Sequence, residues 1–158
     1  MPLSKHLTRW IMASVAEHFD ARRQGLTMFV EGQLRETKTL KDFIELRVDG
    51  PYLTELSNDY WEVFIEINIL VQSAQDQINY HRIYASVGIV TAAFEHIIQI
   101  FRIGKELADD GTLVGCMKLK GDKDARERIQ TNHFGQVEPE TGIFQSSVEG
   151  HYVMELHE

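Results

Sequence analysis

The chain has little cysteine, little proline and no long apolar run, and each scarcity excludes a class of protein. Its 158 residues include one cysteine, Cys116, so neither an intrachain disulfide framework nor a cysteine-rich zinc site can form. Its apolar runs fall short of the roughly 18 residues of a membrane span. Arg9, Glu17 and His18 interrupt the first apolar residues, so we expect no signal peptide. Since 43% of the residues are hydrophobic, we expect residues 1–158 to form one globular domain.

Positive charge is also scarce. Sixteen Lys and Arg residues face 24 Asp and Glu residues, which leaves a net charge of −8. The basic residues are scattered in pairs, such as Arg22 with Arg23 and Arg126 with Arg128, with no interleaved aromatic side chains. Affinity for nucleic acid comes mainly from Lys and Arg on phosphates, so the composition argues against sequence-specific DNA recognition.

The clearest pattern in the sequence runs from Tyr60 to Val71. Apolar residues occupy one phase of a strict alternation, and Glu62, Glu66 and Asn68 occupy the other. A period of two over about twelve residues predicts a long antiparallel strand with one packed face. Phe64 and Leu70 interrupt the polar phase, which indicates a subunit contact on that face.

Similar patterns predict the remaining elements. Helical spacing is expected over residues 4–22, with Ser4 as N-cap, and over 76–96, which should pack on the apolar face of the sheet. Asp49-Gly50-Pro51 and Ser57-Asn58-Asp59 have the chemistry of turns. Besides 60–71, strands are expected over residues 26–31, 43–48, 97–103, 113–119, 126–132 and 144–156. The predicted fold is α+β, a mixed and mainly antiparallel sheet of about six or seven strands packed by two helices.

No local motif indicates catalysis. The seven histidines have no helical zinc spacing, and no GxGxxG, GxxxxGK[ST] or GxSxG pattern occurs. Glu62 and Glu66 are about 13 to 14 Å apart along an extended strand, too far for the paired carboxylates of a glycosidase. Cys116, beside Met117 on a predicted strand, has the pattern of a small buried residue. We therefore expect neither an enzyme nor a bound cofactor or metal.

Most of the chain, from about Phe43 to Leu156, resembles small structural proteins of tailed-bacteriophage particles. The order of one helix, three strands, a helix and further strands is similar to that of tail terminator proteins, which cap the tail tube and meet the head connector. The resemblance lies in the segments FIELRVDGPYLTELSNDYWEVFIEINILVQS, INYHRIYASVGIVTAAF, IIQIFRIGKE, GTLVGCMKLKGD, FGQV and QSSVEGHYVMEL.

This resemblance implies a homo-oligomeric ring, commonly a hexamer, at the head–tail junction of a virion, assembled in the host cytoplasm. Its partners would be tail tube and head connector proteins, with no membrane. Genomic DNA would pass through the lumen without specific binding, because a lumen of like charge does not retain it. The loop from Gly32 to Lys41 would order on docking to a neighbouring ring. The candidate lumen-facing or subunit-interface residues are Glu45, Glu62, Phe64, Glu66, Asp109 and Asp110.

Three other interpretations remain open at this stage. A neck or head-completion adaptor and a tail tube subunit would also present β-rich faces to neighbours. A small enzyme or ligand-binding domain could assemble a site from distant residues such as His81, His133 and Glu95.

Overall fold

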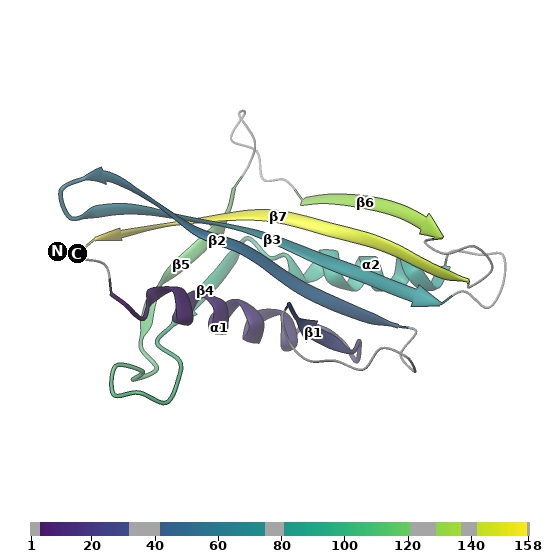
Figure 1. Ribbon diagram of the computed structural model, residues 1–158, viewed down its shortest axis with the longest axis horizontal. Coiled ribbons are helices and arrows are strands. Elements are labelled where there is room, and N and C mark those ends of the chain that lie inside the picture. Colours follow the sequence, from purple (N-terminus) through teal and green to yellow (C-terminus); the bar gives the residue numbers. More distant parts are fainter. Residues whose placement is uncertain (1–3, 32–41, 75–80, 121–128, 137–141, 158) are drawn as a thin grey trace.

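The computed structural model describes residues 4–31, 42–74, 81–120, 129–136 and 142–157 (Figure 1). The chain is an α+β fold, and the order of one helix, three strands, one helix and four strands confirms the sequence prediction. The elements are α1 (Leu7–Asp20), β1 (Met28–Val30), β2 (Phe43–Ser57), β3 (Tyr60–Ala74), α2 (His81–Ala93), β4 (Ile97–Phe101), β5 (Leu113–Leu119), β6 (Ile129–Gln136) and β7 (Ile143–His157).

The described strands form one mixed sheet, in which six strands follow the order β1-β2-β3-β7-β5-β4 and the seventh, β6, also pairs with β7. Among the described strand pairs, only β1 with β2 is parallel. At its centre, β3 and β7 pair without interruption from Tyr60↔His157 to Ala74↔Ile143. The other edge of β7 is shared: β6 pairs with its first half and β5 with Tyr152 and Val153. The sheet therefore forks along β7.

Strand β3 shows the expected alternation. Val63, Ile65, Ile67, Ile69 and Val71 are at most 1% exposed. The residues between them are half-buried rather than fully exposed. One face of β3 is thus packed in the core, while the other is a partly covered surface.

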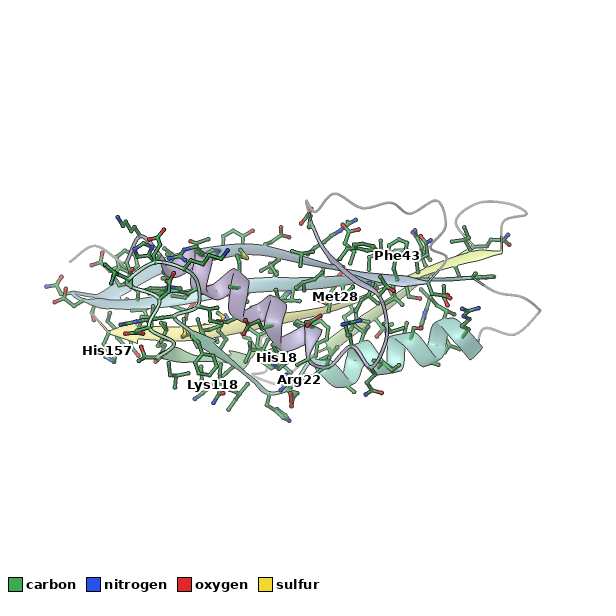
Figure 2. All side chains as sticks on the ribbon, turned by 90° about the horizontal axis from the view of Figure 1, so that it is seen from below. His18, Arg22, Met28, Phe43, Lys118 and His157 are labelled. Carbon is green, nitrogen blue, oxygen red and sulfur yellow. The ribbon has the colours of Figure 1, made fainter. Side chains whose placement is uncertain are left out.

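Both helices lie on the packed face of the sheet, as Figures 1 and 2 show from two directions. Helix α2 contacts β3 and β7, as expected, and α1 contacts β4 and β2. The ends of the two helices meet where the rings of Phe19 and Phe94 lie 5.1 Å apart, edge to face. Phe94 also stacks on Tyr152, whose hydroxyl donates a hydrogen bond of 2.7 Å to the carbonyl of Glu95. These aromatic side chains join both helices to β7.

The predicted turn at Asp49-Gly50-Pro51 is wrong. Strand β2 continues through it, and the register with β3 only shifts between Asp49 and Tyr52. Gly50 permits this bulge, since its φ is 109° and a Cβ there would lie 2.9 Å from the carbonyl oxygen of Phe64.

The expected break at Ser57–Asp59 is confirmed as the turn of a long β2–β3 hairpin. This hairpin reaches past the start of α1 at one end of the molecule (Figure 1).

The helix boundaries and one cap also differ from the prediction. The N-cap of α1 is His6 without a side-chain cap, and Ser4 instead accepts a hydrogen bond from the amide of His6. Helix α2 ends at Ala93, three residues early, and β4 ends at Phe101. Strand β6 extends four residues past Asn132 because it follows β7 as far as Phe144. The loop 32–41 and residues 76–80, 126–128 and 137–141 lie outside the described residues.

Two glycine-to-alanine substitutions test the packing on β7. A Cβ at Gly150 would lie 2.7 Å from the buried ring of Phe94, so one of the two must shift, whereas a Cβ at Gly88 in α2 meets nothing within 4 Å. We expect Gly150→Ala to lower the free energy of unfolding by about 1–3 kcal/mol. Gly88→Ala should raise it by up to about 1 kcal/mol, because alanine is the better helix former. Urea denaturation of both variants measures the two signs, and a neutral Gly150→Ala would contradict the packing.

Candidate interaction surfaces

Four of the six candidate residues share one face of the sheet, the face opposite the helices. We call it the outer face. The register places Glu45 of β2 directly opposite Leu70 of β3, so both side chains lie on the outer face. Glu62, Phe64 and Glu66 follow on that side of β3. The alternation in the sequence predicted the common face of Glu62, Phe64 and Glu66, whereas the place of Glu45 beside them follows from the pairing of β2 with β3.

Phe64 is the centre of an aromatic cluster on the outer face. Its ring centroid lies 6.1 Å from that of Tyr52 and 5.5 Å from that of His151. The ammonium group of Lys120 lies 5.2 Å from the same centroid. Tyr52 is 52% exposed, so the cluster is open to a partner. Phe64, which interrupts the polar phase of the sequence, thus belongs to a patch formed by β2, β3, β7 and the residue after β5.

The acidic residues of the outer face differ in exposure. Glu62 and Glu66 are half-buried, opposite Glu155 and His151 of β7. Glu45 is only 5% exposed, and its carboxylate accepts a hydrogen bond of 3.3 Å from Nε of Arg47. Of the three candidate acids on this face, Glu62 and Glu66 are therefore the two that reach solvent.

Asp109 does not belong to this face, because its side chain is fully enclosed between the loop after β4 and α1. Arg9 donates two hydrogen bonds to the carboxylate, of 2.5 and 2.9 Å, and Nε1 of Trp10 donates one of 2.6 Å. The backbone amide of Glu106 donates a fourth. Gly104 makes room for this cluster, since a Cβ there would lie 2.2 Å from both Arg9 and Asp109. Asp109 thus fastens a loop and is not available to a lumen.

The cluster changes the acidity of Asp109. Hydrogen bonding to the Arg9 guanidinium, followed by that to Trp10, holds the pKa of the Asp109 carboxyl well below its ordinary value. The neighbouring Asp110 is exposed. Hydrogen bonds from the hydroxyl and amide of Thr112 lower its pKa as well.

The projecting part of the β2–β3 hairpin was not foreseen, since the sequence places a turn at its base. Tyr52, Leu53 and Leu56 expose 52%, 43% and 48% of their surface there. Large apolar side chains left in water at the end of a hairpin are typical of a contact surface. In the sequence, the alternation that predicts β3 already begins at Tyr60. A strand that pairs with that end of β3 must be equally long, and no other feature of the sequence indicated the length of β2.

A cleft of about 460 Å³ separates α1 from β4. Glu17 and His18 of α1 and Arg22 just after it line one side, and Ile97 and Gln99 of β4 the other. Nε2 of His18 lies 2.9 Å from the carbonyl oxygen of Ala93, and burial lowers the pKa of the imidazole. Neutral His18 therefore donates to that carbonyl, which fixes α1 against the chain just before β4.

His133 and Glu95, which a small enzyme or ligand-binding domain would have to bring together, are far apart. His133 contacts Ser146, near the start of β7, while Glu95 contacts Tyr152, six residues and about 20 Å further along that strand. The side chain of His81 is not described. Cys116 is free and half-buried rather than buried. Within the described residues, no group of three His, Cys, Asp or Glu side chains converges on a point that could hold a metal ion.

Comparison with known proteins assigns no family. No protein-family model matches the chain, and a search of curated proteins finds no match. Among the described residues, no helix has the length and apolar character needed to cross a membrane.

The Asp109 cluster predicts an acid-dependent stability. A carboxylate with a depressed pKa in the folded state stabilises the fold above its unfolded value, near 3.8, and loses that contribution as the pH falls further. We expect Asp109→Asn to lower the melting temperature at pH 7 by several degrees and to flatten the loss of stability below pH 4.

Asp110→Asn is the matched control, because Asp110 is exposed and adjacent. It should change the melting temperature much less. Thermal melts from pH 7 to pH 2.5 measure both profiles. Equal effects of the two substitutions would contradict the assignment.

Proposed function

We propose that this chain is a structural protein of a tailed-bacteriophage particle, a tail terminator that forms a ring at the head–tail junction. The observation that carries the proposal is the long β2–β3 hairpin, which leaves the body of the molecule and exposes Tyr52, Leu53 and Leu56. A projecting hairpin that exposes three large apolar side chains is suited to fit against other protein chains.

The sheet also supports assembly into a ring. Its order begins at β1 and β2 and ends at β4, so the two terminal edges have different sequences and surroundings. Pairing of one edge with the other in a second copy is a head-to-tail contact, which generates a closed ring when the rotation closes. A symmetric dimer would instead need one edge to pair with itself.

The outer face supports a role for this ring as a conduit. With both helices on the opposite side, a ring whose lumen is lined by this face would present Glu62 and Glu66 together with Glu149 and Glu155. Arg47, Lys118 and Lys120 lie on the same face, so these four acids still outnumber the three bases. Duplex DNA passes such a lining with little attraction.

The size of the assembly tests the proposal first. We expect mass photometry and negative-stain images of the purified chain to show closed rings, with six 18.2-kDa chains giving about 109 kDa. Long tubes of stacked rings would instead favour a tube subunit. A chain that stays monomeric at high micromolar concentration, alone and with tail tube protein, would overturn the proposal.

Charge reversal tests the lumen. We expect Glu62→Lys with Glu66→Lys to give rings that bind duplex DNA about tenfold or more tighter than the unmodified ring at low salt, with steep salt dependence. The control is Asp20→Lys with Glu106→Lys, which changes net charge equally at exposed positions on α1 and the loop after β4. Fluorescence anisotropy measures both affinities, and equal binding by the two variants would contradict a lumen lined by the outer face.

A further inference from the structure

Helix α1 is fixed at two points, one on the free edge of β4 and one on the last residue of α2, and the interval between them is open. At one end, the hydroxyl of Ser14 accepts a hydrogen bond of 2.9 Å from the amide of Phe101 and donates one of 3.3 Å to its carbonyl. At the other end, His18 is bonded to Ala93. Between these two contacts lies the cleft of about 460 Å³ (Figure 2 labels His18 and Arg22 on its helical side).

The backbone of Ile97 and Gln99 faces this cleft. The carbonyl of His96 accepts from the amide of Leu119 in β5, so His96, Ile98 and Ile100 direct their backbone groups toward β5. The residues between them direct theirs to the opposite side, as the bond from Phe101 to Ser14 shows. No described strand pairs with this side, and Ile97 is 47% exposed. The edge thus offers two outward-facing residues for strand pairing.

The far end of the same sheet offers a matching edge. Strand β1 pairs with β2 only from Ile44 to Leu46, and no described strand pairs with that side of β2 beyond it. After the bulge, Tyr52 and Thr54 pair with Phe64 and Glu62 of β3, whose backbone groups are directed toward β2. The backbone groups of Leu53 and Glu55 are therefore directed away from β3. The bulge and the turn at Ser57 limit this free edge of β2 to two residues, as many as Ile97 and Gln99 provide on β4.

We propose that the Leu53–Glu55 edge of one copy adds as a strand to the Ile97–Gln99 edge of the next copy, in the cleft beside α1. This proposal rests on the proposed ring and names the contact that closes it. The matched lengths favour a second copy as the occupant: each edge has two outward residues, and each is limited by fixed structure on both sides. The hairpin projects from the body, so it can reach a neighbour, and the walls of the cleft on α1 give it a defined path. Strand addition also removes two open edges that otherwise invite uncontrolled pairing.

Proline substitutions test the contact, because proline removes an outward amide without breaking the bonds on the other side of the strand. We expect Gln99→Pro and Glu55→Pro each to prevent ring formation, raising the protein concentration needed for assembly about tenfold or more. Gln99→Thr and Glu55→Thr keep the amide and a good strand former, so they should assemble as the unmodified chain does. Circular dichroism and thermal melts establish that each variant is folded.

Mixing the two proline variants gives the sharper result. Gln99→Pro retains an intact β2 edge and Glu55→Pro an intact β4 edge, so one copy of each can form one native contact and no more. We expect the equimolar mixture to form dimers and to stop there, while each variant alone stays monomeric. Rings formed by either proline variant, or a mixture without dimers, would overturn the contact.

Cross-linking covers the case in which a proline variant fails to fold. In a Cys116→Ser background, Glu55→Cys is combined with Ile97→Cys or with Gln99→Cys, the two positions it can face. We expect one of the pairs to form intermolecular disulfides in a ladder up to the size of the ring. Rings without a ladder in either pair would refute this contact and leave the proposed function standing, whereas the absence of any ring would remove both.

Discussion

The antiparallel ladder between β3 and β7 is the constraint on which the rest of the structure depends. It runs for the full length of both strands without a register shift, from Tyr60↔His157 to Ala74↔Ile143. Because the side chains of a strand alternate between its faces, this ladder sets every residue of β3 on the core or on the outer face. The helices can pack only on the side where Ile65 and Ile69 point. The aromatic and acidic residues of the outer face are then left together on the other side.

Within the described residues, two stretches of sheet edge have no partner strand. Strand β1 covers β2 only from Ile44 to Leu46, and β4 is the last strand of the sheet, so no described strand pairs with its side away from β5. Helix α1 covers the end of β4 through Ser14 and is bonded to the end of α2 through His18, and the Asp109 cluster holds the loop after β4 against the same helix. Fixed structure thus surrounds each open interval. A neighbour entering there meets a preorganised edge, which lowers the entropy lost on association.

Much of the fold could be predicted from the sequence, because apolar residues at every second position mark a strand even where most of its residues are buried. Val63 to Val71 specify β3 in this way, and β5 was predicted with its observed limits. Long-range partners could not be predicted. Gly50 and Pro51 have the local chemistry of a turn, yet pairing with Phe64 keeps them within β2. Asp109 looked like a surface acid in a polar loop, and its enclosure depends on Arg9 and Trp10, about a hundred residues earlier. The shared face of Glu62, Phe64 and Glu66 was predictable because one strand carries all three.

The central claim is that this chain acts by fitting against copies of itself through the ends of its sheet. A cryo-EM reconstruction of the purified assembly, at a resolution that separates strands, tests it most directly. The account predicts a closed ring in which the sheet of each copy continues from β4 into β2 of the next, with the outer face toward the lumen and the helices outside. Copies that meet through their helices, with both sheet edges in solvent, would contradict it.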